Sequence, residues 1–237
     1  LEESHDKSRI FQAPILMSSL ILLRHGQAMF GGDDYDRLSE LGERQARATG
    51  AFLAARGMTF DRVLVGPRRR HRQSAEAVLA AWPQPVKIEI EPALDEFADG
   101  GALLVSARQR HEASGGSWPK TRSEQLALYL REIQHWSAGS PIAGCRPAAE
   151  FYAVVGNWLQ RLQTEHGPGQ RLQAVTSAGT IAALICQVLE LPPARIFDFI
   201  QAMHNAALTE IVFSGGRASV RSFNAAGHLP VELLSFI

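Results

Sequence analysis

Residues 20–27 read LILLRHGQ and join an apolar run to a basic turn that contains glycine. Four consecutive apolar residues indicate a strand buried on both faces of a sheet. His25 follows at the carboxyl end of that strand, where one ring nitrogen can point at a ligand while a backbone carbonyl holds the other. Arg24 adds a planar guanidinium that suits phosphate oxygens. The stretch therefore predicts a site for a phosphoryl group.

Strand and helix patterns alternate along the rest of the chain. Apolar runs predict further strands at residues 62–65, 87–90 and 172–176, and a Ser-Gly-Gly-Arg turn at 214–217 predicts a C-terminal β-hairpin. Helical spacing predicts helices at residues 40–56, 68–82, 121–136, 151–162 and 181–189. Together they predict an α/β fold in three layers, a mostly parallel central sheet with helices on both faces and an antiparallel C-terminal hairpin. Because ligands bind beyond the carboxyl ends of such strands, residues 24–25, 66–67 and 177–178 are expected to converge.

The domain organisation is expected to be simple. Residues 1–16 are interpreted as an N-terminal extension, because Met17 stands directly before the first strand, and residues 17–237 as a single domain. Residues 98–119 are rich in Gly, Ser and Ala with weak periodicity, which predicts an insertion loop over the site. The insertion region, residues 98–147, is expected to set substrate specificity. It holds four candidate contacts for an anionic substrate, each more typical of a surface position: Arg108, Arg110, His111 and Lys120.

Composition narrows the class of partner. The chain has 24 basic and 24 acidic residues and no formal net charge, which argues against nucleic acid or an anionic membrane as the main partner. Two cysteines are too few for a disulfide framework or a zinc cluster, and both are expected to be reduced in a cytoplasmic protein. A cysteine-based phosphatase loop is excluded, since Phe151 and Pro192 stand where its arginine is required. A small phosphorylated substrate is expected, with no metal or organic cofactor, and composition does not predict the oligomeric state.

Four segments together resemble the histidine phosphatase superfamily, which has the phosphoglycerate-mutase-like fold. The LRHGQ of residues 23–27 is similar to its signature after the first strand. Residues 36–46 (DRLSELGERQA), 66–75 (GPRRRHRQSA) and 94–96 (LDE) are similar to its later motifs, in the same order. Residues 66–75 follow the superfamily pattern S-P-x-x-R-A-x-Q-T-A, with Gly66 where Ser is usual. The resemblance spans most of the chain.

The resemblance implies a role for each matching residue. His25 is the nucleophile that attacks phosphorus, and Glu96 is the acid that protonates the leaving oxygen. Arg24 and Arg70 bind the phosphoryl oxygens and stabilise the transition state. Gln27 either hydrogen-bonds the substrate or braces its loop.

Other charged residues near these motifs are expected to play smaller parts. Three carboxylates compete with Glu96 as proton donor: Glu89, Glu91 and Asp95. Three basic residues are expected to form a solvated helix face: Arg68, Arg69 and Arg72. Three carboxylates offer a weaker alternative, a Mg²⁺ site: Asp33, Asp34 and Asp36.

Residues 175–179 (VTSAG) depart from the superfamily's V-[ST]-H-G-G segment, because Ser177 stands where a second catalytic histidine is expected. Losing one such donor costs about 2.7–4 kcal/mol of transition-state stabilisation. The Ser177 hydroxyl and the backbone N–H of Ala178 remain available to bind an anion, and a tight turn without a binding role is the alternative. His204 and His228 are considered as compensating imidazoles.

These residues predict a phosphomonoester hydrolase that works through a phosphohistidine at His25, with activity weakened by the missing histidine. One alternative is a mutase of the phosphoglycerate type, which returns the phosphoryl group to another hydroxyl. The other is a phosphate-binding protein with little catalysis.

Overall fold

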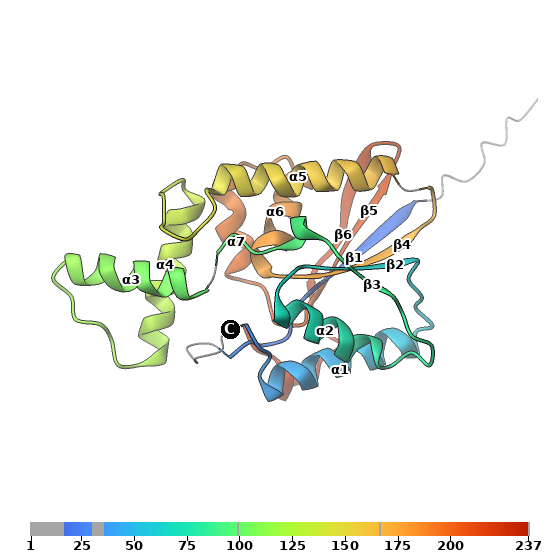
Figure 1. Ribbon diagram of the computed structural model, residues 1–237, viewed down its shortest axis with the longest axis horizontal. Helices are drawn as coiled ribbons and strands as arrows, with labels where there is room; N and C mark the ends of the chain where they lie inside the picture. The colour runs from blue at the N-terminus through green and yellow to red at the C-terminus, as the bar shows by residue number, and fades with distance from the viewer. Residues whose placement is uncertain (1–16, 30–35, 99, 166, 237) are drawn as a thin grey trace, which may run out of the picture.

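The computed structural model describes residues 17–29, 36–98, 100–165 and 167–236 (Figure 1). Its strands are β1 (Ser18–Arg24), β2 (Arg62–Val65), β3 (Ile88–Ile90), β4 (Arg171–Thr176), β5 (Leu208–Ser214) and β6 (Arg217–Ala225). Its helices are α1 (Glu40–Ala55), α2 (Arg69–Leu79), α3 (Gly100–Ala113), α4 (Arg122–Ser137), α5 (Ala148–Glu165), α6 (Ala178–Val188) and α7 (Ile196–Ile200). The predicted extension at residues 1–16, and Asp33 and Asp34, lie outside the described residues.

The strands form one mixed sheet in the order β3-β2-β4-β1-β5-β6. Strands β1 to β4 run parallel, whereas β5 is antiparallel to both β1 and β6. Arg24 at the end of β1 lies beside Thr176 at the end of β4. The α/β fold with a C-terminal hairpin is therefore confirmed, and the segments that follow β1 and β4 leave the sheet side by side.

Helices cover both faces of the sheet: α1 and α2 lie on one face and α5 and α6 on the other (Figure 1). Alternate side chains of β1 enter the two resulting cores. Leu20 and Leu22 pack in the core that includes α5 and α6, while Ile21 and Leu23 pack in the core that includes α1 and α2. A strand with both faces covered requires apolar residues at every position, which explains its uninterrupted apolar run.

Local sequence signals account for several boundaries. Ser39 caps α1 by accepting a hydrogen bond from the backbone N–H of Gly42, and Thr121 caps α4 in the same way through Glu124. The hairpin turns at Gly215 and Gly216, which have φ of +56° and +76°. Two consecutive positive φ angles suit a two-residue turn between antiparallel strands and are costly for any residue with a Cβ.

The prediction of a loop at residues 98–119 is wrong, because Gly100–Ala113 forms helix α3. This helix buries Leu103 and Ala107 but has no continuous apolar stripe. Polar contacts help to hold it to α4: Glu132 of α4, which is 1% exposed, accepts hydrogen bonds from Ser106 and Arg110 of α3. A helix docked partly through a buried carboxylate lacks the apolar periodicity that predicts helices.

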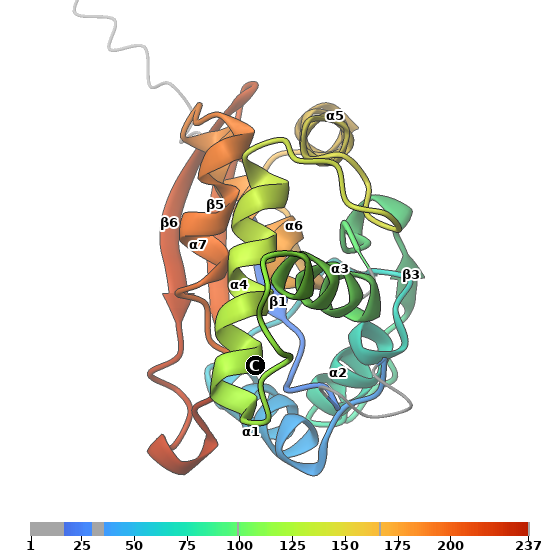
Figure 2. The ribbon, with the colours of Figure 1, turned by 90° about the vertical axis from the view of Figure 1, so that its left-hand side faces the viewer.

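Helices α3 and α4 form an arm that extends beyond the carboxyl ends of the strands (Figures 1 and 2). Seen from that side, both helices lie across the end of β1, with α4 beside α7 (Figure 2). The insertion region thus lies over the predicted site, but it forms helices where a loop was predicted. None of the helices described in the structure is long and apolar enough to cross a membrane.

Candidate active site

A cavity of about 110 Å³ is lined by residues from the carboxyl ends of the strands and from the arm. Its polar lining contains all four predicted catalytic residues, Arg24, His25, Arg70 and Glu96. They come from the end of β1, the first turn of α2 and the loop that follows β3. Of the segments expected to converge, residues 24–25 and Ala178 line the cavity, whereas Gly66 and Pro67 do not; helix α2, which begins at Arg69, brings Arg70 there instead.

His25 is held as a neutral imidazole whose unprotonated Nε2 faces Arg70. Its Nδ1 lies 2.7 Å from the carbonyl oxygen of Gly26, and because a carbonyl only accepts, Nδ1 carries the ring proton. Nε2 is then unprotonated and accepts a hydrogen bond of 3.2 Å from Nε of Arg70. Burial, reinforced by Arg70, holds the pKa of His25 well below its ordinary value. This is the protonation state that a nucleophile needs.

Arg70 is buried and held by three segments of the chain. Besides His25, its guanidinium donates to Asp36 Oδ1 at 2.8 Å and to Ser177 Oγ at 3.3 Å. Arg24, also buried, donates from Nη1 to the carbonyl oxygen of Met203. Two buried guanidinium groups at one cavity create a positive potential that favours an anion such as a phosphoryl group. The role of Asp36 in orienting Arg70 was not predicted, because nothing local to residue 36 indicates its partner.

Two backbone N–H groups hold the carboxyl group of Glu96 at the cavity. Its Oε1 accepts from the N–H of Phe97 at 3.0 Å, and its Oε2 accepts from the N–H of Gly179 at 3.2 Å. Burial raises the pKa of Glu96, while those two donors and Arg70 oppose the shift. A raised pKa keeps a larger fraction of the carboxyl group protonated, as a general acid requires.

The competing carboxylates are engaged elsewhere. Glu89 forms an ion pair of 2.6 Å with Arg62, and Glu91 accepts from the backbone N–H two residues along. Asp95 forms an ion pair of 2.5 Å with Arg68 and also accepts from the N–H of Glu96. Arg68 therefore braces the Glu96 loop and is not part of a solvated face, which corrects that expectation. Two basic residues, Arg69 and Arg72, are exposed as predicted.

Gly179 allows Glu96 to reach its position. A Cβ at residue 179 would lie 2.1 Å from Oε1 of Glu96 and 2.7 Å from the ring of Phe97. We expect Gly179→Ala to displace the carboxyl group and lower kcat by about 10²-fold, the usual cost of moving a reacting group by an ångström. Phosphate release and a thermal melt would measure the effect, with Gly167→Ala as the control because its Cβ would meet nothing within 4 Å. Unchanged kcat in a folded Gly179→Ala protein would contradict this role.

The other three residues predicted to bind the substrate, besides Arg24 and Arg70, occupy different positions. Ala178, at the start of α6, lines the cavity. Gln27 is not among the lining residues; its side chain accepts from the Ser39 hydroxyl at 2.9 Å, so its loop-bracing alternative is the one observed. Ser177 is 1% exposed and is not among the described lining residues. Its hydroxyl contacts Nε2 of His71 at 2.6 Å and Arg70 at 3.3 Å, so it holds Arg70 and does not face the cavity.

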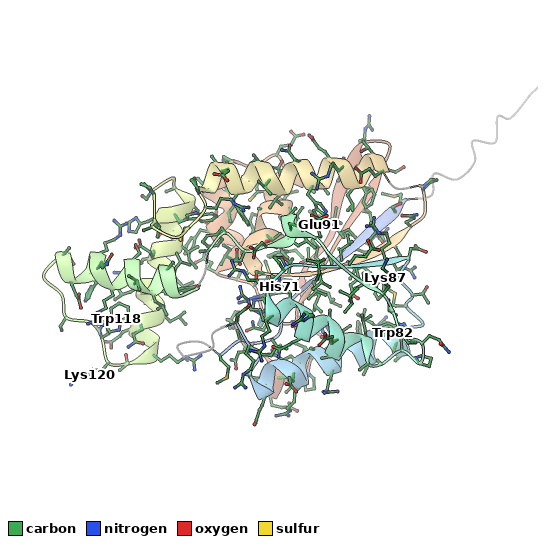
Figure 3. All side chains as sticks on the ribbon, in the orientation of Figure 1. His71, Trp82, Lys87, Glu91, Trp118 and Lys120 are labelled. Carbon is green, nitrogen blue, oxygen red and sulfur yellow. The ribbon has the colours of Figure 1, made fainter. Side chains whose placement is uncertain are left out.

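His71 is a further residue of the site that the sequence did not predict. It is fully buried one residue after Arg70, and its ring centroid lies 5.6 Å from that of His25. Figure 3 shows it at the centre of the molecule, on α2 near the strand ends. Its signal was a histidine at a motif position where the superfamily pattern has Ala. Neither His204 nor His228, the two compensating candidates, belongs to the described lining of the cavity.

The arm's four basic candidates also lie off the described cavity lining. Arg108 forms an ion pair with Glu112 and Arg110 pairs with Glu132, whereas Lys120 lies toward the tip of the arm, away from His71 (Figure 3). The rest of the described lining is mostly apolar, with Gln201 as its polar member. Its larger apolar side chains are Phe97, Leu103, Leu126, Tyr129, Leu130, Ile133, Ile200 and Phe236.

Among the described residues, no group of three His, Cys, Asp or Glu side chains is placed to hold a metal ion. Asp36, from the segment considered for Mg²⁺, instead pairs with Arg70. Cys145 and Cys186 are not disulfide-bonded, and burial raises the pKa of each thiol to about 11.

Comparison with known proteins points to one family. A sequence model of the histidine phosphatase superfamily (branch 1) matches residues 20–226. The mitochondrial serine/threonine-protein phosphatase Pgam5 of Drosophila ananassae is 22% identical over 227 residues, covering 91% of this chain and 66% of that protein. The chain thus spans just under two thirds of that relative's length, and 68% of the Xenopus laevis PGAM5.

Solved structures show the same fold. A mycobacterial glucosyl-3-phosphoglycerate phosphatase has a TM-score of 0.65 and 21% identity, covering 89% of this chain and all of that one. The phosphoglycerate mutase of Bacillus anthracis has a TM-score of 0.64 and 18% identity, covering 90% of this chain and 95% of that one. At such identities the likeness concerns the fold alone.

Proposed function

We propose that this chain, which belongs to the histidine phosphatase superfamily, hydrolyses phosphomonoesters through a phosphohistidine intermediate at His25. The observation that carries the proposal is the state of His25: Nδ1 donates to a carbonyl, and the unprotonated Nε2, hydrogen-bonded to Arg70, belongs to a residue that lines the cavity. Arg24 and Arg70 supply positive charge for the phosphoryl oxygens, and Glu96 supplies a proton.

In the first step, the Arg70 N–H that contacts Nε2 of His25 moves its hydrogen bond to a phosphoryl oxygen. Nε2 then attacks phosphorus and forms an N–P bond while the bond to the ester oxygen breaks. Glu96 transfers its proton to that oxygen, and the alcohol leaves. In the second step, the Glu96 carboxylate accepts a proton from water as the water oxygen attacks phosphorus. The N–P bond breaks, inorganic phosphate leaves, and both residues return to their starting states. These steps need no metal or organic cofactor.

We further propose that the leaving group carries an apolar portion. The wall that the arm contributes is formed by apolar side chains of α3 and α4, with Leu126 and Leu130 half-buried along it. Burial of an apolar group there contributes roughly 25 cal/mol per Å² of apolar surface. Among the described lining residues the charged cations are Arg24 and Arg70, which the phosphoryl group occupies. A second anionic group would lack a cationic partner there and would have only the Gln201 amide, which favours hydrolysis over a phosphoglycerate mutase reaction.

The test is a phosphate-release screen over a panel of phosphomonoesters with the wild-type chain. The panel includes p-nitrophenyl phosphate, 1-naphthyl phosphate and 3-phosphoglycerate, and a separate assay follows isomerisation of the phosphoglycerate. We expect phosphate release that is most efficient for the aryl esters, together with an acid-labile phosphoenzyme. Isomerisation faster than release would favour the mutase, and phosphate binding without any turnover would favour a binding protein.

The arm's part in specificity has its own test. We expect Leu130→Glu to lower kcat/KM for 1-naphthyl phosphate at least about tenfold, because a carboxylate in the apolar wall disfavours an aromatic leaving group and repels the phosphoryl anion. The matched control is Ala127→Glu, which places the same charge on an exposed position of α4 that does not line the cavity. Equal losses in the two variants would show that the arm's charge matters and the wall does not.

A further inference from the structure

We propose that His71 is a positioning residue whose imidazole holds the Ser177 hydroxyl, which in turn holds the Arg70 guanidinium beside His25. The inference concerns the phosphate-binding geometry and rests on the proposed function for its effect on turnover. Its test therefore includes a measurement that needs no turnover.

Hydrogen bonds join Arg70, Ser177 and His71 in a continuous chain. A guanidinium only donates, so Ser177 Oγ accepts from Arg70 Nη2 at 3.3 Å. The same hydroxyl is hydrogen-bonded to Nε2 of His71 at 2.6 Å, and the ring tautomer sets which of these two atoms donates. Burial, together with Arg70 and Arg68, holds the pKa of His71 well below its ordinary value, so the ring is neutral. The three side chains are 3%, 1% and 0% exposed, so water does not compete for these bonds.

The chain makes room for this ring at a second position. A Cβ on residue 66 would come within 2.3 Å of Nδ1 of His71 and 2.4 Å of the carbonyl oxygen of Leu94, and Gly66 has none. The motifs that this chain resembles have Ser, Ala and His at positions 66, 71 and 177, whereas here they are Gly66, His71 and Ser177. The three differences fit one another sterically. The imidazole comes from α2 and not from the junction between β4 and α6, and residue 66 has no side chain to occupy the space of the His71 ring.

A histidine buried only for packing would not need these contacts. Its Nε2 would require some hydrogen-bond partner, but that partner would not have to touch the arginine that contacts the candidate nucleophile. Here Arg70 contacts both Ser177 and His25 Nε2, so a shift of Ser177 is transmitted to the cavity. Asp36 holds the opposite side of the same guanidinium at 2.8 Å.

The first experiment compares His71→Leu with His71→Gln, since the glutamine amide can reach the place of Nε2 and leucine cannot. Calorimetry measures the affinity for inorganic phosphate, and p-nitrophenyl phosphate gives kcat and KM. We expect His71→Leu to bind phosphate about tenfold more weakly than the wild type and to lose more than tenfold in kcat. His71→Gln should have a phosphate affinity and a kcat at least fivefold higher than those of His71→Leu. Arg72→Ala, an exposed neighbour on α2, is the control. Equal values for His71→Leu and wild type, in a protein with an unchanged thermal melt, would overturn the proposal.

The second experiment moves the imidazole to the other position. We expect His71→Ala to weaken the site, Ser177→His to damage it through a clash with the His71 ring, and the double variant to be at least fivefold more active than either. A folded double variant that is no more active than either single variant would overturn the inference that the imidazole can act from either position. If the double variant does not fold, the comparison of His71→Leu with His71→Gln decides. If the wild type turns over no ester, the proposed function fails, and phosphate affinity alone judges the role of His71.

Discussion

Replacing His25 by alanine is expected to lower kcat for p-nitrophenyl phosphate by at least about 10⁴-fold, to the limit of detection. The variant lacks the atom that forms the N–P bond, and no other described imidazole lines the cavity. His71, the nearest ring at 5.6 Å between centroids, points its Nε2 at Ser177 and cannot replace it. The phosphoenzyme should disappear together with turnover.

Phosphate affinity separates catalysis from binding in this variant. Because Arg24 and Arg70 remain, His25→Ala should still bind inorganic phosphate, within about tenfold of the wild type. His135→Ala, which removes an exposed histidine of α4, is the control for the loss of a ring elsewhere. Hydrolysis by a His25→Ala protein at more than a hundredth of the wild-type rate would eliminate the phosphohistidine route.

Glu96→Gln is expected to produce the second largest loss, and its size should depend on the leaving group. An alkoxide is a poor leaving group without a proton, so alkyl phosphates should lose about 10²–10⁴-fold in kcat. The p-nitrophenolate ion leaves unprotonated, so p-nitrophenyl phosphate should lose much less. Both rates, measured on one preparation, give a ratio that a general loss of folding would not change. Glu89→Gln, which alters the Arg62 ion pair at the sheet edge, is the control.

The same two residues set the expected pH dependence. Burial lowers the pKa of His25, so its neutral form persists below the ordinary value of about 6.5 and is lost only as the pH falls further. Burial raises the pKa of Glu96, so the acid form persists above its ordinary range and is lost as the pH rises. For an alkyl phosphate we expect kcat/KM to decline with rising pH and Glu96→Gln to abolish that decline. A decline that survives the substitution would assign the acid to another group.

Much of the fold could be predicted because its signals are local. An apolar run without alternation indicated β1, residues with oxygen-bearing side chains at 39 and 121 marked helix starts, and two glycines marked the hairpin. Helix α3 could not be predicted in this way, because a carboxylate on another helix, Glu132, helps to dock it. Helix α7 is only five residues long and has too few turns to show periodicity.

The sequence by itself determined the family, the strand that carries His25, and the set of Arg24, Arg70 and Glu96 around it, since each sits in a motif read along the chain. Only the tertiary structure decided which side chains support that set. Insertion of β4 between β1 and β2 brings residues 71 and 177 together, and their pairing places an imidazole where no motif indicated one. Contacts between segments a hundred residues apart depend on strand order, which local patterns do not encode.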